Sequence, residues 1–408
     1  MHIIHLGKYY FPAVGGMESL IRSQAHAQAE SGHKVEVVVI NHLTPSGADV
    51  LGKSLGITQT STENDGAVLV HRASRFGNIA KCDFTMSLRD SIRMIAKRKP
   101  DVWHLHTPNA TMVLCLQGLL NQCKPLVVTH HSDIINQRVL RPAYNWAERR
   151  VYNRASLILS DSPNYIEGSR QLHPFLNKVD VLPIGIDVAD YEKPSAEVLD
   201  WERRFRIEFG APLWLCVGRL ASYKALEVAI QALVNVPGKL AVIGVGPCEA
   251  QWKQLAVQLG VAERIQWLGR CSEPQLRGAY RAATALWFPS NARNEGFGIV
   301  QVESMASGCP VINTDIQHSG VSWVSQHERT GLTVPVNNAA ALATAACRLL
   351  DEQGLRQKLS DAGKKRASCN FDQDSLNKQC IEFYEKAINI SVNRQPTASG
   401  PIHPLSND

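Results

Sequence analysis

Two glutamates flank the start of a predicted helix in the segment N-E-G-F-G-I-V-Q-V-E-S-M-A-S-G, residues 294–308. Glu295 lies in a polar loop before the helix and Glu303 about two turns inside it, because apolar residues recur every three positions from Ile299. The backbone N–H groups at a helix start attract anions such as a diphosphate. A carboxylate accepts two hydrogen bonds from a sugar or ribose diol. The segment is typical either of a sugar-phosphate site or of a helix with an acidic capping residue and a solvated glutamate.

Two cations occupy one predicted loop, G-R-L-A-S-Y-K, which follows an apolar strand at residues 213–217. Arg219 could bind two phosphate oxygens at once, whereas Lys224 would act as a point charge. Loops after parallel strands often form ligand sites, so this pair fits a diphosphate. Simple solvation of two surface side chains is the alternative.

Histidines follow another predicted strand in the run T-H-H-S-D, residues 129–133. These residue types could form a metal site or a hydrolase-like group, but no third ligand follows at the short spacing that metal sites use. Either histidine could instead hydrogen-bond a backbone carbonyl. A D-x-D pattern at residues 372–374 stands directly before a predicted helix, where capping is the better explanation. We therefore expect no metal ion.

A glycine pair, Gly15 and Gly16, lies where the first predicted strand, residues 3–6, meets the first predicted helix, residues 17–30. In such a β-loop-α-β unit, glycines let the backbone approach a ligand closely, although a simple turn would also explain them. The spacing is not G-x-G-x-x-G, so a dinucleotide cofactor is not the first choice.

The elements that must position these residues are strands and helices that alternate along nearly the whole chain. With 408 residues, 44% of them hydrophobic and 20% charged, the chain is an ordinary globular protein too long for one typical core. Strands that alternate with helices form parallel sheets with right-handed crossovers. We therefore predict an α/β fold with two Rossmann-like domains.

The composition of the chain limits the kinds of binding partner and the cellular compartment that we expect. A net charge of +6 is too small to indicate nucleic acid, but it is compatible with an anionic ligand or membrane surface. The ten cysteines are scattered without a C-x-x-C pair, which favours reduced thiols. The N-terminus lacks the features of a signal peptide, and no apolar run approaches a membrane span. We expect a cytoplasmic protein without a nucleic-acid partner.

Arginines and aromatic residues are interleaved in the segment R-V-L-R-P-A-Y-N-W-A-E-R-R-V-Y-N-R, residues 138–154. Such a segment can rest on an anionic bilayer, which would make the protein peripheral on the inner face of the cytoplasmic membrane. The arginines that would contact the lipid are Arg138, Arg141, Arg149 and Arg150. The commoner case is a surface helix whose aromatic side chains pack inward.

The frame E-G-F-G-I-V-Q-V-E-S-M-A-S-G, together with G-R-x-x-x-x-K, resembles the signature of retaining glycosyltransferases of family 4 (glycosyl transferases group 1), which have the GT-B fold. The resemblance implies two Rossmann-like domains facing a cleft and a C-terminal helix that crosses back to the first domain. The implied parts are an acceptor-side domain (1–185), a nucleotide-sugar domain (186–372), the crossing helix (373–390) and a disordered tail (391–408). Two residues depart from the pattern: Ile184 replaces an asparagine, and Ala225 replaces a glycine.

The resemblance also implies roles for the candidate residues. Glu295 would bind the hydroxyls of the donor sugar, Glu303 the ribose hydroxyls, and His131 would lie beside the sugar, so His131 and Glu295 are the catalytic candidates. The donor-binding candidates are Gly15, Gly16, Arg219, Lys224, Glu295, Phe297, Gly298, Ile299, Val300 and Glu303. No cofactor is expected. In the favoured account of the family, the leaving phosphate takes the proton of the acceptor in a front-face substitution.

The start K-Y-Y-F-P-A-V-G-G-M-E is similar to that of enzymes of bacterial surface polysaccharide synthesis. We expect transfer of a hexose, with mannose from GDP-mannose as the best candidate, to a lipid-linked saccharide of an O-antigen, capsule or exopolysaccharide. Two alternatives are open. A nucleotide-sugar epimerase of the same fold would turn over without an acceptor, and a non-catalytic subunit would only bind the sugar nucleotide.

Overall fold

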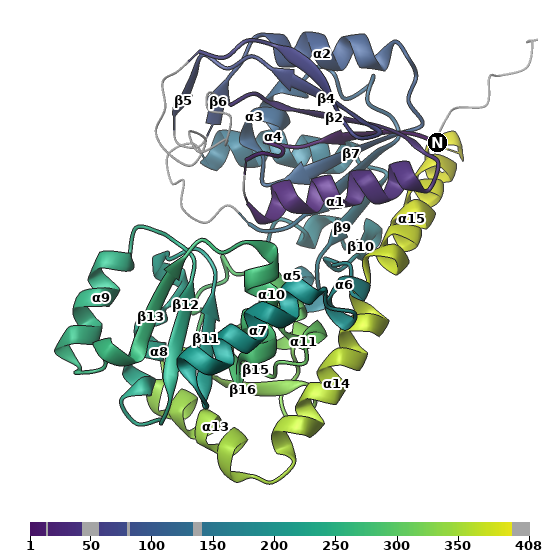
Figure 1. Cartoon of the computed structure of the whole chain (residues 1–408). Coiled ribbons are helices and arrows are strands. Elements are labelled where there is room, and N and C mark those ends of the chain that lie inside the picture. The colour runs from purple at the N-terminus through teal and green to yellow at the C-terminus, as the bar shows by residue number, and fades with distance from the viewer. Residues whose placement is uncertain (14, 43–56, 80–81, 134–140, 394–408) are drawn as a thin grey trace, which may run out of the picture.

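Two parallel β-sheets form the framework of the computed structural model (Figure 1). The structure describes residues 1–13, 15–42, 57–79, 82–133 and 141–393. The first sheet has the order β10-β9-β8-β7-β1-β2-β4-β3, and only its edge strand β3 is antiparallel to its neighbour. Its strands are β1 (His2–Leu6), β2 (Lys34–Ile40), β3 (Ser61–Asp65), β4 (Val68–Ala73), β7 (Val102–Thr107), β8 (Leu126–His130), β9 (Leu157–Ser160) and β10 (Val179–Val181). A separate hairpin joins β5 (Gly77–Ile79) and β6 (Cys82–Phe84).

Helices cover both faces of the first sheet because its central strands are apolar on both sides, as buried parallel strands must be. Ile4 and Leu6 of β1 pack in one core with α2, α3 and α4, whereas Ile3 packs in another with the C-terminal helix α15. The helices of this half are α1 (Gly16–Glu30), α2 (Ser87–Ala96), α3 (Ala110–Cys115), α4 (Arg141–Arg154) and α5 (Pro163–Gly168), with the 3-10 helix η2 (His173–Lys178).

The second sheet is entirely parallel, with the order β13-β12-β11-β14-β15-β16. Trp214 of β11 and Trp287 of β14 stack in its core with ring centroids 4.9 Å apart. Its strands are β11 (Leu213–Val217), β12 (Lys239–Ile243), β13 (Ile265–Gly269), β14 (Ala285–Phe288), β15 (Val311–Asp315) and β16 (Gly331–Pro335). The helices are α6 (Ala189–Glu192), α7 (Ala196–Phe209), α8 (Leu226–Leu233), α9 (Glu249–Gln258), α10 (Glu273–Ala282), α11 (Ile299–Ala306), α12 (Val321–Val324), α13 (Ala339–Asp351) and α14 (Leu355–Asn370), with η3 (Ser222–Lys224) and η4 (Ala262–Arg264).

The last helix, α15 (Gln373–Asn393), returns to the first sheet, as Figure 1 shows in yellow. Its Cys380 sulfur accepts a hydrogen bond from Gln24 of α1 at 3.1 Å. Asp372 caps the helix through the backbone N–H and the hydroxyl of Ser375, which confirms the capping interpretation of the D-x-D pattern. The helix continues past residue 390 to Asn393, and the rest of the predicted tail lies outside the described residues.

The carboxyl ends of the two sheets face each other. A Cβ at Gly296, which follows β14, would lie 2.8 Å from the backbone oxygen of His131, which follows β8. All ten cysteines are free thiols. None of the helices in the described ranges is long and apolar enough to cross a membrane.

Candidate active site

An ion pair at the carboxyl end of the second sheet joins Lys224 of η3 to Glu295 of the loop after β14. The Nζ atom lies 2.5 Å from Oε2, and the Ser290 hydroxyl donates to the same oxygen at 3.2 Å. Both side chains are largely buried, with 15% and 11% exposed. β11 and β14 are neighbours in the sheet, so two residues far apart in the sequence meet at its edge.

Arg219 lies in the same loop as Lys224, and it is exposed. The preceding Gly218 has a φ of +140° and packs against the Lys224 side chain, where a Cβ would be 3.3 Å from Nζ. The loop therefore holds one cation tightly and presents the other to solvent. This arrangement can bind an anion that approaches the carboxyl edge of the sheet.

The start of α11 lies close to this ion pair. Its N-cap, Gly298, has a φ of +78°, and a Cβ there would be 2.8 Å from the ring of Phe288. The same ring lies 4.8 Å from Nζ of Lys224. The half-buried Ile299 and Val300 form the first turn, whose backbone N–H groups have no partner within the helix. The helix start and Lys224, both of which carry positive charge, thus both lie close to the ring of Phe288.

Phe297, a predicted donor-binding residue, has a buried side chain. Its side chain is 3% exposed and packs edge-on against Phe371, with ring centroids 5.7 Å apart, and near Trp323. The ring belongs to the core of the second domain because residues from α14 and α12 close over it. Only its backbone can contribute to a ligand site.

Glu303 lies one turn inside α11 rather than two, because the helix begins at Ile299. The Tyr280 hydroxyl donates a hydrogen bond to Oε2 of Glu303 at 2.8 Å. Within the described part of the chain, no other side chain donates to this carboxylate. Burial raises the pKa of Glu303, and the hydrogen bond from Tyr280 opposes that shift. Its second carboxylate oxygen is left to accept hydrogen bonds from a ligand.

His131 occupies the opposite side of the site. Its Nδ1 lies 3.1 Å from Oδ1 of Asp161, and its Nε2 lies 3.3 Å from Nδ1 of His106. Both ring nitrogens are therefore engaged by the protein. A hydrogen bond from this ring to a ligand would require one of the two contacts to open.

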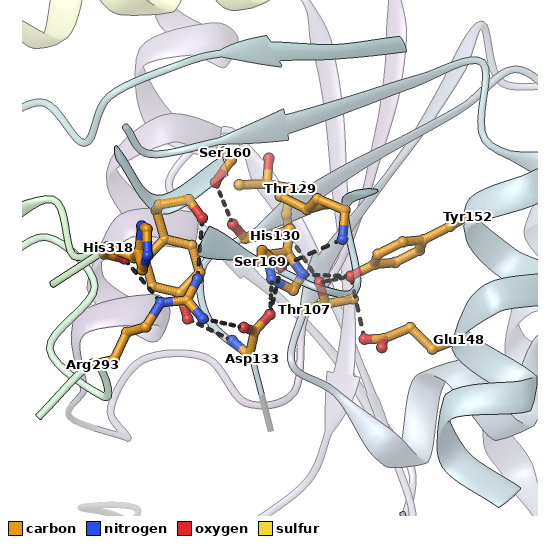
Figure 2. Close-up of polar contacts among 12 residues, drawn as sticks. Thr107, Thr129, His130, Asp133, Glu148, Tyr152, Ser160, Ser169, Arg293 and His318 are labelled. Carbon is orange, nitrogen blue, oxygen red and sulfur yellow. Dashed lines mark hydrogen bonds and ion pairs between the residues drawn. The ribbon is translucent and has the colours of Figure 1, made fainter. Parts of the chain in front are cut away.

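His130, the neighbouring histidine, has a structural role. Its Nδ1 lies 2.6 Å from the Tyr152 hydroxyl and its Nε2 lies 3.0 Å from Oδ1 of Asp133 (Figure 2). Because both nitrogens are used, the ring offers no open position for a metal ion. Asp133 also accepts a hydrogen bond from Nη1 of Arg293 at 2.7 Å. This contact links the two domains, and Arg293 lies two residues before Glu295 in the sequence.

The surroundings of Asp133 stabilise its negative charge. Burial by itself would raise its pKa, but hydrogen bonds from His130 and Ser169 and the charge of Arg293 lower it. Arg293 also donates to the backbone oxygen of His318 (Figure 2). It donates to the backbone oxygen of Tyr165 as well. The interdomain contact is thus an ion pair embedded in further hydrogen bonds.

The glycine pair opens α1 near His131. A Cβ at Gly15 would lie 2.2 Å from a carboxylate oxygen of Glu18, whereas the space over the exposed Gly16 is open. Burial raises the pKa of Glu18, and the charges of Lys8 and His131 oppose the shift. Gly15 therefore makes room for a carboxylate that faces His131.

Sequence reasoning assigned no role to Asp161, Arg293 or Glu18. Asp161 directly follows the buried strand β9, as His131 directly follows β8. A polar residue at the carboxyl end of a buried strand was the signal for His131, and the same signal could have identified Asp161. Glu18 stands in the first turn of α1, beside the predicted glycine pair. Arg293 gave no such signal, since its partner Asp133 lies in the other domain.

Comparison with known sequences identifies the family. The family model described as "Glycosyl transferases group 1" matches residues 200–366, and that described as "Glycosyltransferase Family 4" matches residues 14–190. The D-rhamnosyltransferase WbpZ of Pseudomonas aeruginosa is 31% identical over 346 residues, which cover 85% of this chain and 85% of the relative. The O-antigen chain mannosyltransferase C of Escherichia coli is 24% identical, over 94% of this chain and 98% of the relative.

Solved structures agree on the architecture. Sucrose-phosphate synthase from Thermosynechococcus elongatus matches with a TM-score of 0.75 and 20% identity, over 95% of this chain and 99% of that one. HepE of Anabaena, solved in complex with UDP, matches with a TM-score of 0.73 and 18% identity, over 94% of this chain and 100% of that one. The chain therefore belongs to the family 4 glycosyltransferases (glycosyl transferases group 1) and has the GT-B fold.

Proposed function

We propose that the protein is a retaining, metal-independent hexosyltransferase that moves mannose from GDP-mannose to a lipid-linked saccharide of a bacterial O-antigen, capsule or exopolysaccharide. The observation that carries this proposal is the ion pair of Lys224 and Glu295 near the start of α11, with the exposed Arg219 in the same loop as Lys224. The names of the relatives support the sugar, because D-rhamnose is the 6-deoxy form of D-mannose and the second relative is a mannosyltransferase.

Charge explains how these residues would promote transfer. When the bond between the sugar and the diphosphate breaks, negative charge grows on the leaving phosphate. In this proposal the backbone N–H groups at the start of α11 and Lys224, which Glu295 already holds, stabilise that charge with little reorganisation, and the exposed Arg219 adds a second cation. In this proposal they take the part that a divalent ion would otherwise play.

The two glutamates would orient the donor. Glu295 accepts hydrogen bonds from the sugar hydroxyls, and the free oxygen of Glu303 accepts them from the ribose. The ion pair with Lys224 holds the Glu295 carboxylate in place. The leaving phosphate would then take the acceptor's proton on the same face of the sugar, which retains the anomeric configuration.

The arginine-rich helix α4 would place the acceptor end of the protein on an anionic membrane. Tyr144 and Tyr152 are buried, but Trp146 is 58% exposed and the Arg150 guanidinium lies 4.9 Å from its ring centre. Arg149 and Arg150 are exposed on the same helix. Arg138 and the side chain of Arg141 lie outside the described residues. The exposed part of α4 thus combines two cations with an aromatic ring, which suits a lipid headgroup region.

A transfer assay tests the proposal. The enzyme is incubated in EDTA with GDP-mannose, GDP-D-rhamnose, UDP-glucose or ADP-glucose, with and without a synthetic polyprenyl-diphosphate-linked saccharide, and products are identified by mass spectrometry and NMR. We expect mannose in α-linkage, formed only with the acceptor and unaffected by EDTA, and loss of product in Glu295→Gln. Turnover without acceptor would indicate an epimerase, and donor binding without turnover a non-catalytic subunit.

A further inference from the structure

A row of polar side chains crosses the first sheet behind the candidate active site. It runs from Asp161 after β9 through His131 after β8, His106 in β7 and His5 in β1 to Gln28 in α1. The four strands are consecutive neighbours in the sheet. The inner members His5, His106 and Gln28 are at most 1% exposed, and the proposed transfer reaction uses none of them. We call these five residues the imidazole row.

Hydrogen bonds join the imidazole row from end to end. The distances are 2.9 Å from Gln28 Oε1 to His5 Nε2 and 3.1 Å from His5 Nδ1 to His106 Nε2. The row continues with 3.3 Å from His106 Nδ1 to His131 Nε2 and 3.1 Å from His131 Nδ1 to Asp161 Oδ1. Every ring nitrogen of its three histidines therefore takes part.

A metal ion is a poor explanation for this cluster. In the described ranges, His5, His104 and His106 form a group whose ligand atoms lie within 4.8 Å of one another. However, His104 Nδ1 lies 2.6 Å from the Tyr384 hydroxyl, and its Nε2 lies 2.6 Å from the Thr129 hydroxyl. Hydrogen bonds already occupy both nitrogens of all three rings, so a metal ion would have to break several of them.

Counting protons along the imidazole row constrains its charge. Each of its four hydrogen bonds needs one proton. The Asp161 carboxylate and the Gln28 carbonyl oxygen, at the two ends, only accept, and a neutral imidazole has one N–H. Three neutral rings supply three protons for four bonds. With the Gln28 oxygen facing His5, one ring must therefore carry a second N–H and a positive charge.

The orientation of the Gln28 amide decides whether this count holds. A reversed amide would donate to His5, and all three rings could then be neutral. In the observed orientation, Nε2 faces two acceptors, the Tyr384 oxygen at 3.3 Å and the Cys380 sulfur at 3.9 Å. Reversal would leave one buried N–H without an acceptor among the described residues, at a cost of about 1–3 kcal/mol. The packing of α15 on α1 thus favours the orientation that needs the extra proton.

Burial decides which ring carries the charge. Desolvation lowers the pKa of His5 to about 4 and holds the pKa of His106 well below its usual value, so both inner rings are neutral. His131, in contrast, is at the partly exposed end and lies against the Asp161 carboxylate. Glu18, with Lys8 beside it, is the other charged group that faces His131.

We propose that Gln28, His5 and His106 are positioning residues that keep His131 as an imidazolium paired with Asp161. The Nε2 proton of His131 is donated to His106, whose own Nε2 proton is donated to His5, whose Nε2 proton is donated to Gln28. The extra proton comes from solvent. A buried glutamine thus controls the charge of a residue two imidazoles away.

The consequence for catalysis rests on the proposed function. The backbone of His131 abuts Gly296, next to Glu295, so a donor bound there would lie beside a fixed positive charge. This charge would favour the departing diphosphate without any hydrogen bond from the imidazole ring to the sugar. It would supplement Lys224 and Arg219 from the opposite domain.

Nitrogen NMR of histidine-labelled full-length protein at neutral pH tests the charge directly. Signals of His131 are assigned by their loss in His131→Asn. We expect both of its ring nitrogens to be protonated in the wild type, and Gln28→Met to lower the ratio of cationic to neutral His131 about tenfold, the effect of one lost hydrogen bond. Gln28→Glu, which keeps an acceptor, should preserve the cation. Gln24→Met is the matched control, because Gln24 also contacts Cys380 from α1 but is not in the row.

Two results would overturn the imidazole row as proposed: one bare nitrogen on His131 in the wild type, or an unchanged ratio in a folded Gln28→Met. Should Gln28→Met not fold, the loss of the cation in Gln28→Glu would overturn it equally. Transfer kinetics separate this inference from the proposed function. We expect the kcat of Gln28→Met to fall about tenfold near neutral pH with KM nearly unchanged, and to recover toward lower pH. A changed NMR ratio with unchanged kcat would keep the row and contradict the catalytic role of the charge.

Discussion

The Nζ atom of Lys224 lies 2.5 Å from Oε2 of Glu295, so the cation that we propose binds the diphosphate is held by the carboxylate that we propose binds the sugar. Both groups are mostly shielded from water, which strengthens their attraction. The pair therefore orients the two residues before a donor arrives. A bound diphosphate would share Lys224 with Glu295 rather than recruit it from solvent.

Glu295→Gln should abolish most of the transfer activity while the protein stays folded. The amide keeps the shape of the side chain but removes the negative charge that holds Lys224. It also replaces one of the two carboxylate oxygens that would accept hydrogen bonds from the sugar hydroxyls. We expect kcat/KM to fall about 100- to 1000-fold, the usual effect of removing one preorganised polar group. Glu249→Gln in α9, which breaks an exposed ion pair with Lys253, is the control and should keep wild-type kinetics. Wild-type activity in Glu295→Gln would refute its role.

The ion pair between Asp133 and Arg293 should couple the two domains during catalysis. Arg293→Met removes the 2.7 Å contact that holds the loop of Glu295 against the first domain, and Asp133→Asn removes the negative charge of that contact. We expect each variant to lose about tenfold in kcat/KM, and a double-mutant cycle to give a coupling of about 1–2 kcal/mol. Strictly additive losses would show that the pair does not act as a unit.

A buried carboxylate at the other end of the first sheet should make its stability depend on pH. Burial by itself would raise the pKa of Glu36, but hydrogen bonds from His71 and His2 and the charge of Arg98 lower it to about 2. Since the folded pKa lies below the unfolded one, this stabilisation is present above the unfolded pKa of 4.5 and is lost as the pH falls through about 2.

Glu36→Gln tests this prediction in urea unfolding followed at several pH values. At neutral pH we expect the variant to lose roughly 2 kcal/mol in free energy of unfolding. The difference from the wild type should shrink steadily below the unfolded pKa of Glu36. A difference that does not change with pH would mean that the charge of Glu36 contributes nothing.

The exposed cations of α4 should bind anionic lipid. We expect the double variant Arg149→Gln/Arg150→Gln to lose most of its recovery in flotation with vesicles that contain anionic phospholipid, since each basic residue near such a surface contributes about 1 kcal/mol. Arg203→Gln/Arg204→Gln in α7 is the matched control, because it removes two exposed arginines from the other domain. Equal recovery of both double variants would exclude α4 as the contact.

Much of the fold could be predicted because central parallel strands are buried on both faces and so appear as continuous apolar runs. β11 and β14 are examples. The glycine pair lies at the start of α1 and the cationic loop follows β11, as predicted. The burial of the Phe297 ring could not be predicted, because Phe371 and Trp323, which pack near it, are distant in the sequence.

The interactions that join elements could not be predicted. Period-two spacing places His104 and His106 on one face of β7, but the contacts of His106 with His5 and His131 depend on the strand order β8-β7-β1. Local patterns do not determine that order. The contact of Arg293 with Asp133 likewise depends on how the two domains face each other.

The donor site in the second domain is the central claim, and a thermal-shift panel tests it most directly. UDP, GDP, ADP and dTDP are compared on the wild type, on Lys224→Ala and on the surface control Lys253→Ala. A ligand that binds only the folded state raises the melting temperature by mass action. We expect GDP to stabilise the wild type and Lys253→Ala alike, and its effect to shrink strongly in Lys224→Ala. If no diphosphate stabilises the wild type, or if Lys224→Ala responds fully, the donor site as described here is contradicted.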